Sequence, residues 1–354
     1  MPLDLFKTMS KTQTIQAIPW WSTASALDFG DIHIKRFSTP ATFAVIAVHS
    51  IRRGPALGGC RCVHYSDPDA ALYDAMRLAR GMSYKAAMAD LALGGGKAVI
   101  MRPSEPFDRV ALFEAFGEFV DSLGGRYITA VDSGTSVADM DIIARRTAHV
   151  ASTSSGTGDP SSYTARGVLR GIEAAVEHRL NKPDLRAIRV AIQGVGNVGY
   201  FLTELLHKAR AEITVADVNT NAIERVVSEF GVNVVSPDEI TRIPCDVFAP
   251  CALGGVLTRD VVQGLRTPIV AGGANNQLAE PGIGEQLVAR QILYAPDYVI
   301  NAGGLIQIAV PTERERLTKI DGIRATLKSI FELSESRKVS TAAIADEMAA
   351  ARIK

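Results

Sequence analysis

The most constraining feature of this chain is a glycine-rich turn between an apolar segment and a helix-patterned one. Residues 190–199 read VAIQGVGNVG, so Gly194, Gly196 and Gly199 fill the pattern G-x-G-x-x-G. In dinucleotide-binding sheets these glycines make the tight turn, admit a pyrophosphate to the main chain and let helix and strand pack closely. The helix N-terminus, here Asn197 and Val198, faces the anionic pyrophosphate. The segment predicts a strand, a helix and a dinucleotide site.

An acidic residue follows at the distance that such a site requires. Residues 213–217 read ITVAD and predict the next strand, which ends in Asp217. A carboxylate there accepts hydrogen bonds from the adenosine ribose hydroxyls and repels a 2′-phosphate. No arginine occurs in residues 218–220. A solvated acid at a strand end is the alternative, but its place after the glycine turn favours NAD as the cofactor.

The remaining pattern predicts an α/β fold with two domains. Regular alternation beyond residue 188 favours a parallel, doubly wound Rossmann-type sheet, with elements at Arg189–Gln193, Val198–Ala209, Ile213–Ala216 and Ala222–Phe230 and strands ending near Ala249, Ala271 and Ala295. The first part predicts a mixed sheet packed with helices, with strands at Asp31–Phe37, Thr42–His49, Ala98–Met101 and Tyr127–Val131 and helices at Pro68–Ala89 and Ala111–Leu123.

The domain limits follow from composition. The Ser/Thr/Gly/Pro-rich stretch Ala151–Tyr163 predicts the linker, which gives a first domain over residues 1–150 and an NAD-binding domain over 151–334. Helices are expected at Thr312–Lys338 and Ser340–Arg352. We expect the C-terminal helices, from about residue 335 to 354, to pack back on the first domain.

Composition narrows the class of ligand. The chain has 354 residues, 47% hydrophobic and 21% charged, with 38 basic and 38 acidic side chains. Balanced charge gives no reason to expect nucleic acid or anionic lipid as a partner. The chain has no apolar run of about twenty residues, and its first residues lack a signal-peptide pattern, so we expect a cytoplasmic protein without membrane spans. The four cysteines are expected to be free thiols, namely Cys60, Cys62, Cys245 and Cys251.

Two lysines bracket a second glycine-rich segment. Residues 82–100 read MSYKAAMADLALGGGKAVI, with Lys85, Lys97 and the triplet Gly94–Gly96. Lysines are normally on the surface, but the triplet lets a ligand or a neighbouring strand approach the main chain. Burial next to a second cation lowers a lysine's pKa toward neutrality. Such an amine can act as a general base.

A third candidate group ends a predicted strand. In residues 126–141, RYITAVDSGTSVADMD, Asp132 follows an apolar strand and precedes a Gly-Thr turn. α/β sheets carry functional groups at this position, although a turn or helix cap is the alternative. Asp139 and Asp141 are interpreted as acids of a helix's first turn and as structural partners.

These stretches carry a resemblance to a known family. The chain resembles the glutamate, leucine, phenylalanine and valine dehydrogenases, and most closely the branched-chain members. The matching stretches are spread in order over residues 54–304, namely GPALGGCR from Gly54, Met82–Ile100, Gly125–Asp141, Gly194–Gly199, CDVFAPCALGG from Cys245, ANNQL from Ala274 and YAPDYVINAGG from Tyr294.

The resemblance implies a reaction and the groups that perform it. Hydride leaves Cα of an amino acid for the nicotinamide, water adds to the resulting iminium, and ammonia departs. Lys85 is implied to bind the substrate carboxylate, Lys97 to activate the water and Asp132 to move protons to and from the amino group. No metal is implied.

Further roles come from the same resemblance. Asn275 and Asn301 are implied to orient the substrate and the nicotinamide, and Thr164 to contact the carboxamide. Gly58 is implied to lie at the substrate. Leu57 stands where glutamate-specific relatives carry a lysine, and an unpaired buried carboxylate is costly.

The implied side-chain pocket is apolar throughout, with Ala130, Leu305 and Ile308 beside Leu57. We therefore expect an apolar L-amino acid of the valine or leucine type, converted to its 2-oxo acid and ammonia. An aromatic substrate (phenylalanine or tryptophan) and a non-catalytic NAD-binding relative are the alternatives, because one methylene discriminates by only about 1–3 kcal/mol.

Some positions depart from the family pattern. Val131 replaces a glutamate of leucine dehydrogenases, Ser133 a valine and Asp90 a glycine. The first fifty residues, including Trp20–Trp21, match poorly. The resemblance further implies a homo-oligomer, a dimer or octamer, formed through the first domain and its N-terminal strands. It also implies a cleft that closes about hinges near Ala151–Tyr163 and Asn301–Pro311.

Overall fold

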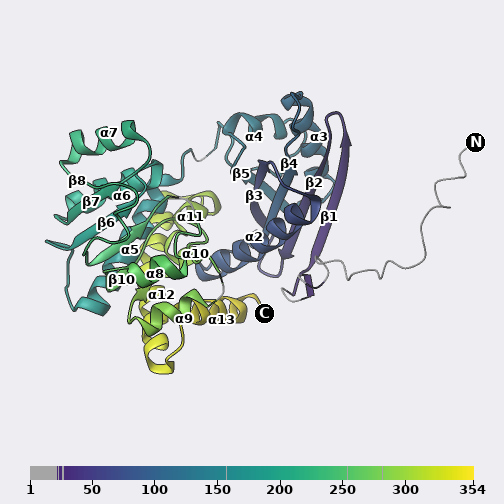
Figure 1. The fold of residues 1–354 in the computed structure, drawn as a ribbon. Coiled ribbons are helices and arrows are strands. Elements are labelled where there is room, and N and C mark those ends of the chain that lie inside the picture. The colour runs from purple at the N-terminus through teal and green to yellow at the C-terminus, as the bar shows by residue number, and fades with distance from the viewer. Residues whose placement is uncertain (1–21, 23, 26–27, 157, 253, 281) are drawn as a thin grey trace, which may run out of the picture.

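The computed structural model describes residues 22–354 except 23, 26–27, 157, 253 and 281. Of the first fifty residues, which match the family poorly, residues 1–21 lie outside the described residues, and these include Trp20–Trp21. The described chain forms two sheets with their helices, side by side and joined through the segment between α4 (Val137–Ile143) and α5 (Ser161–Leu180) (Figure 1).

The first domain is built on a mixed five-stranded sheet in the order β1-β2-β4-β3-β5. β1, β2 and β4 pair antiparallel, whereas β4, β3 and β5 pair parallel, which confirms the predicted mixed sheet. The strands are β1 (Asp31–Ser38), β2 (Ala41–Ser50), β3 (Ala56–Val63), β4 (Gly94–Met101) and β5 (Tyr127–Val131), and the helices are α2 (Pro68–Met88), α3 (Arg109–Asp121) and α4.

One central strand is absent from the sequence-based prediction. β3 reads ALGGCRCV, and its two adjacent glycines interrupt any alternation of apolar and polar residues. Glycine is also depleted in strands. β3 nevertheless lies between β4 and β5, so the sheet cannot be completed from sequence patterning alone.

The second domain confirms the predicted parallel sheet. Its six strands are ordered β11-β10-β9-β6-β7-β8 and all pair in parallel. The strand order reverses between β6 and β9, and ligands of doubly wound sheets bind at the carboxyl ends of the strands beside such a point. The strands are β6 (Arg189–Gln193), β7 (Glu212–Ala216), β8 (Asn233–Val234), β9 (Val247–Pro250), β10 (Ile269–Val270) and β11 (Leu293–Tyr294).

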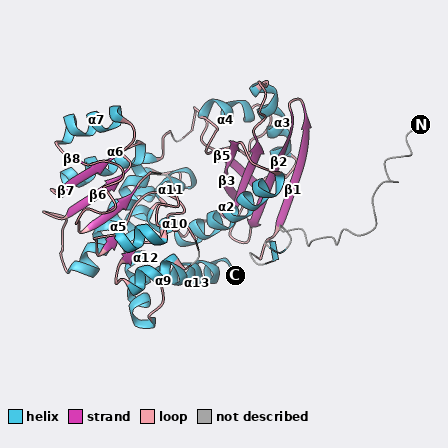
Figure 2. Cartoon of the chain, viewed as in Figure 1, coloured by secondary structure: helices cyan, strands magenta, loops and turns pink. Residues whose placement is uncertain are grey.

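Helices surround these strands (Figure 2). They are α5, α6 (Asn197–Lys208), α7 (Thr220–Phe230), α8 (Arg259–Gly264), α9 (Ile283–Ala289), α10 (Asp297–Ile300), α11 (Gly303–Ala309), α12 (Glu313–Arg337) and α13 (Thr341–Ile353). α12 packs on α5, while α13 packs on α2 of the first domain. Arg352 of α13 donates to the carbonyl oxygens of Ala87 and Met88 at 3.2 and 3.1 Å, which satisfies carbonyls that a helix end leaves free.

The linker ends before the predicted Tyr163, because Ser161–Tyr163 already form the first turn of α5. Ala151 N still donates to the Thr129 carbonyl in β5, at 2.7 Å. The domain limits at residues 150/151 and about 335 stay predictions. No helix in the described part of the chain is long and apolar enough to cross a membrane.

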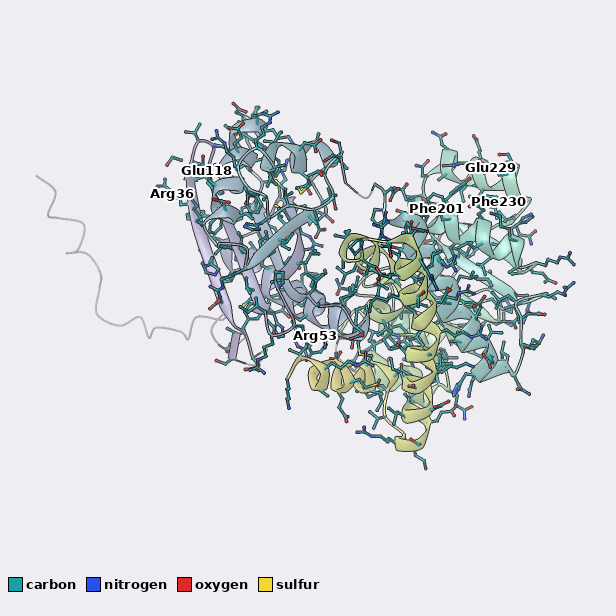
Figure 3. All side chains as sticks on the ribbon, turned by 180° about the vertical axis from the view of Figure 1, so that it is seen from behind. Arg36, Arg53, Glu118, Phe201, Glu229 and Phe230 are labelled. Atoms are coloured by element: carbon teal, nitrogen blue, oxygen red, sulfur yellow. The ribbon has the colours of Figure 1, made fainter. Side chains whose placement is uncertain are left out.

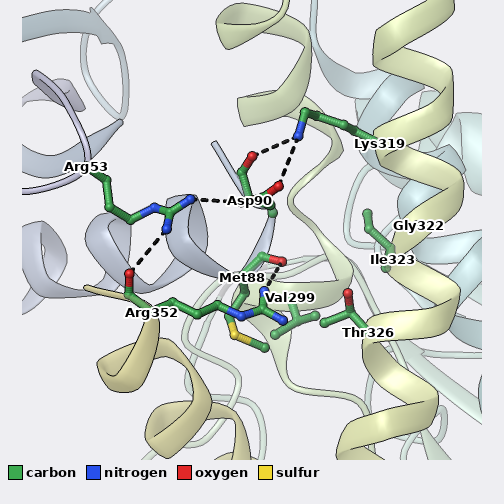
Figure 4. A pocket seen from close by; sticks show the side chains of 10 residues that line it. Arg53, Met88, Asp90, Val299, Lys319, Gly322, Ile323, Thr326 and Arg352 are labelled. Carbon is green, nitrogen blue, oxygen red and sulfur yellow. Dashed lines mark hydrogen bonds and ion pairs between the residues drawn. The ribbon is translucent and has the colours of Figure 1, made fainter. Parts of the chain in front are cut away.

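The domains also meet around Asp90, in the turn after α2 (Figure 4). Asp90 has a φ of +49°, a left-handed conformation that favours glycine. Arg53, at the junction of the domains in Figure 3, pairs with the Asp90 carboxylate at 2.9 Å. Lys319 of α12 donates to the Asp90 carbonyl at 2.7 Å, so this turn ties α12 to the first domain beside a pocket of about 450 Å³.

Candidate active site

A cleft of about 380 Å³ brings residues of both domains together. It is lined by Lys97 in the middle of β4, by the carboxyl end of β5 and, in the second domain, by Val198 in the first turn of α6. Most of the residues that the sequence singled out line it, namely Leu57, Lys85, Lys97, Ala130, Asp132, Thr164, Val198, Asn275, Asn301, Leu305 and Ile308.

Lys97 and Asp132 form the centre of the cleft. Lys97 lies within β4 and Asp132 directly follows β5, with β3 between the two strands. Lys97 Nζ is in direct contact with Asp132 Oδ2. The contact depends on Gly59 of β3, because a Cβ at this position would lie 2.7 Å from Asp132 Cβ. Asp132 therefore lines the cleft in contact with Lys97, and its role in a reaction stays a prediction.

Gly58, the neighbouring glycine, does not line this cleft among the described residues. A Cβ on Gly58 would lie 1.7 Å from the Gly96 carbonyl oxygen in β4, so glycine is required there for strand packing. Its own carbonyl accepts a 2.6 Å hydrogen bond from the Tyr127 hydroxyl. The structure places Gly59 at the cleft instead, and substrate contact at Gly58 stays a prediction.

The glycine triplet before Lys97 serves packing as well. A Cβ on Gly95 would lie 2.0 Å from the backbone nitrogen of Ser83 in α2. α2 fills the space next to Gly95, so this glycine leaves no open space for a ligand. Because α2 lies so close to β4, Lys85 near its end reaches the same cleft as Lys97.

Burial changes the pKa of both lysines. Lys97 is only 6% exposed, and burial lowers its pKa to about 7, with the charges of Arg61 and Lys85 acting in the same direction. Burial also lowers the pKa of Lys85 to about 8, against the opposing charge of Asp297. An amine with a pKa near neutrality can exchange protons under physiological conditions.

A hydrogen-bond network connects Lys85 with the second domain. Lys85 Nζ donates to Asn275 Oδ1 at 3.2 Å. Asn301 Nδ2 donates to the same oxygen at 2.7 Å and to the Gly273 carbonyl at 3.2 Å. Thr164, in the first turn of α5, donates to the Pro160 carbonyl at 3.0 Å. The groups expected to orient ligands therefore lie together and are held in place.

One part of the cleft, which is the predicted pocket for the substrate side chain, is lined by apolar residues. Leu57, Ala130 and Leu305 are 5%, 4% and 7% exposed, and Ile308 is half-buried beside them. Val131 also lines the cleft. Ser133 supports Asp132 through its backbone, whose N–H donates to Asp132 Oδ1.

The glycine turn after β6 has the geometry that its sequence predicts. A Cβ on Gly199 would lie 2.0 Å from the Gly194 carbonyl oxygen, so only glycine lets α6 begin this close to β6. No side chain of a described residue caps the N-terminus of α6, which leaves the amides at exposed Asn197 free for an anion. Gly196 is exposed at the same turn.

Asp217 also stabilises this turn. Its Oδ2 accepts from Val195 N at 2.7 Å and its Oδ1 from Asn219 N at 2.8 Å. Each carboxylate oxygen keeps a second lone pair for a ribose hydroxyl. The turn, the open helix N-terminus and this acid together fit a dinucleotide.

Sequence patterning missed five further polar residues of the cleft, Gly59 aside. These are Arg61, Ser161, Asn276, Asp297 and Tyr298. Arg61 and Asp297 are charged residues in otherwise strand-like or apolar stretches, and that is a signal the sequence does contain. Asp139 is confirmed as structural, since it caps α4 with Ser136 and pairs with Arg109 at 2.7 Å.

Comparisons with known proteins place both domains in one family. Residues 33–149 match the family described as Glu/Leu/Phe/Val dehydrogenase, dimerisation domain. Residues 156–225 and 211–332 match the family described as Glutamate/Leucine/Phenylalanine/Valine dehydrogenase.

Individual relatives cover most of the chain. It is 45% identical to leucine dehydrogenase of Geobacillus stearothermophilus, over 88% of this chain and 86% of the relative. It is also 45% identical to valine dehydrogenase of Streptomyces virginiae, over 88% and 89%. The crystal structure of L-tryptophan dehydrogenase from Nostoc punctiforme superposes with a TM-score of 0.83 at 39% identity, covering 94% of this chain and 98% of that one. The chain therefore belongs to the Glu/Leu/Phe/Val dehydrogenase family and is an amino acid dehydrogenase, an oxidoreductase.

Proposed function

We propose that this enzyme catalyses the NAD-dependent, reversible oxidative deamination of an apolar L-amino acid, of the valine or leucine type, to the 2-oxo acid and ammonia. The observation that carries the proposal is the contact of buried Lys97 with Asp132, in a cleft with an apolar side-chain pocket. Proton-handling groups and an apolar wall are the two properties that this reaction needs.

The roles of the polar residues follow from their positions. Lys85, held by Asn275, binds the substrate carboxylate as a cation. Asp132 takes a proton from the substrate ammonium and later returns it to the departing nitrogen. Lys97, in its neutral form, takes a proton from the water as the water oxygen bonds to Cα. The nicotinamide, when bound, supplies the acceptor for the hydride from Cα. Asn301 and Thr164 orient the reactants in the cleft.

NAD is the proposed form of the nicotinamide cofactor. The carboxylate of Asp217 supports this choice, because it repels a 2′-phosphate. We expect Asp217→Asn to keep the oxygen acceptor, lose the charge and reduce the preference for NAD over NADP by about tenfold or more, about 1.4 kcal/mol. The exposed Asp238→Asn in the same domain is the control and should leave the preference unchanged. An unchanged preference in Asp217→Asn would contradict the assignment.

The substrate class is tested by adding each of the twenty amino acids to the enzyme with NAD and following NADH absorbance. Turnover of valine or leucine well above the other amino acids is the expected result. The likeness to an L-tryptophan dehydrogenase structure supports an aromatic amino acid as the second candidate, and a higher kcat/KM for phenylalanine or tryptophan would favour it. NAD binding by calorimetry without turnover in either direction would indicate a non-catalytic relative.

We further propose a homo-oligomer, a dimer or octamer, assembled through the first domain. β1 is an edge strand of its sheet, and Ile34 of β1 and Phe43 of β2 are 60% and 42% exposed. Exposed apolar side chains on a sheet edge favour contact with another copy. A monomer in multi-angle light scattering would contradict this. The cytoplasm is the proposed location, since all four cysteines are free thiols.

A further inference from the structure

Arg61 is a charged residue of the cleft without a role in the scheme above. It lies on β3, paired in register with Val99 of β4, and it lines the cleft together with Lys97. Its NH2 atom lies 3.7 Å from Asp132 Oδ1, while Lys97 contacts Oδ2 of the same carboxylate. The Arg61 guanidinium and the Lys97 amine therefore face one carboxylate, each on its own oxygen.

A second acid holds Arg61 in this position. Arg61 NH1 lies 2.7 Å from Asp74 Oδ2, and the Tyr65 hydroxyl donates to the same oxygen at 2.7 Å. Burial alone would raise the pKa of Asp74, but the hydrogen bonds from Tyr65 and Arg61 outweigh it, so the pKa is lowered and Asp74 stays ionised. Asp74 belongs to α2, three helical turns before Lys85, so one helix supplies both the anchor of Arg61 and a second cation of the cleft.

We propose that Arg61, held by Asp74, is a positioning residue that orients the Asp132 carboxylate and keeps the Lys97 amine unprotonated for its role as base. The role of neutral Lys97 as a base rests on the proposed function. The arrangement of charges around Lys97 is independent of the substrate.

The physical argument compares the charges around Lys97. Asp132 by itself stabilises the protonated form, because an opposite charge in contact favours the ammonium. Arg61 acts against this in two ways: its own charge repels the ammonium, and its guanidinium shares the carboxylate. After burial, Arg61 is the largest cause that lowers the pKa of Lys97. The groups that face Lys97 are Asp132 after β5, Arg61 and Cys60 from β3, and Asp74 and Lys85 from α2.

The test measures the titration of Lys97 directly. Full-length enzyme is labelled briefly with acetic anhydride across a pH series, and acetylation of Lys97 is quantified by mass spectrometry, with exposed Lys208 as internal reference. We expect Arg61→Met to raise the labelling midpoint of Lys97 by about one pH unit or more. The acid limb of kcat/KM should move in the same direction.

Two further variants separate charge from geometry. Arg61→Lys keeps the positive charge. The lysine ammonium lacks the planar fork of a guanidinium, so it cannot contact the carboxylates of Asp74 and Asp132 together. Its labelling midpoint should stay near that of the wild type, while kcat falls about tenfold or more because Asp132 loses its orientation. Arg77→Met is the matched control, because Arg77 also pairs with Asp74, at 3.2 Å, but does not line the cleft among the described residues. It should leave both the midpoint and kcat unchanged.

An unchanged Lys97 midpoint in folded Arg61→Met overturns the inference, as does an equal shift in Arg77→Met. If circular dichroism shows that Arg61→Met does not fold, Arg61→Gln provides the same neutral change with a polar side chain. Labelling needs no turnover, so a wild-type enzyme that oxidises no amino acid would refute the proposed function and still leave this inference tested.

Discussion

Replacement of Lys97 by arginine removes the proposed base and retains the positive charge opposite Asp132. The magnitude follows from the pKa of Lys97, which burial lowers from 10.5 to about 7. At pH 8 an amine with this pKa is about 90% neutral, whereas one with the ordinary value is about 0.3% neutral, which is a difference of about 300-fold. Arginine is never neutral in this range. We expect Lys97→Arg to lower kcat by about 10²- to 10⁴-fold, the usual contribution of a general base.

The pH profile gives the sign of the effect. Below pH 7 the neutral fraction of Lys97 falls tenfold per pH unit, so kcat/KM of the wild type should fall toward acid. Above about pH 8 Lys85, whose pKa is about 8, loses the charge that binds the substrate carboxylate, so kcat/KM should fall toward alkali as well. The assay follows NADH formation with valine and leucine between pH 6 and 10, and calorimetry checks that Lys97→Arg still binds NAD. Small primary amines should partly restore the activity of Lys97→Ala, because they can enter the vacated space as free bases.

Two results would refute this reasoning. One is a Lys97→Arg enzyme that keeps more than about a tenth of the wild-type kcat, since arginine cannot accept the proton. The other is a wild-type acid limb that persists in Lys97→Arg, because the limb would then belong to a different group.

Substitutions at three further positions test other parts of the protein. Lys85→Met should raise KM for the amino acid by about 10- to 100-fold, the equivalent of a lost charge-assisted hydrogen bond of about 1.5–3 kcal/mol, without changing NAD affinity; calorimetry with NAD is the control. Leu305→Ala enlarges the buried pocket and should favour phenylalanine over valine by about 10-fold or more in kcat/KM; an unchanged ratio would exclude this residue from the pocket. Asp90→Ala and Asp90→Gly lose the same ion pairs, so their difference isolates backbone strain. We expect the glycine variant to be more stable by about 1 kcal/mol in denaturant unfolding, and equal stability would argue against the left-handed conformation.

The sequence determined much of the second domain. The glycine pattern at residues 194–199 and the acid at Asp217 follow local rules of turn geometry and helix packing, and both are confirmed as elements of a parallel sheet. Periodicity also located α2 and the two C-terminal helices, because these helices are long and carry regular apolar faces. The resemblance to known dehydrogenases named the lysines and the aspartate of the cleft.

Only the tertiary structure decided how these residues meet. β3 contains two adjacent glycines and lacks the alternating pattern that predicts a strand. It nevertheless places both Gly59 and Arg61 next to Asp132. Residues on three strands and one helix are distant in sequence, and strand order rather than spacing places Lys97 against Asp132. The lowered pKa of Lys97 arises from burial and from charges of other elements. Desolvation and long-range charge depend on the packed fold, so no local pattern in the sequence carries that information.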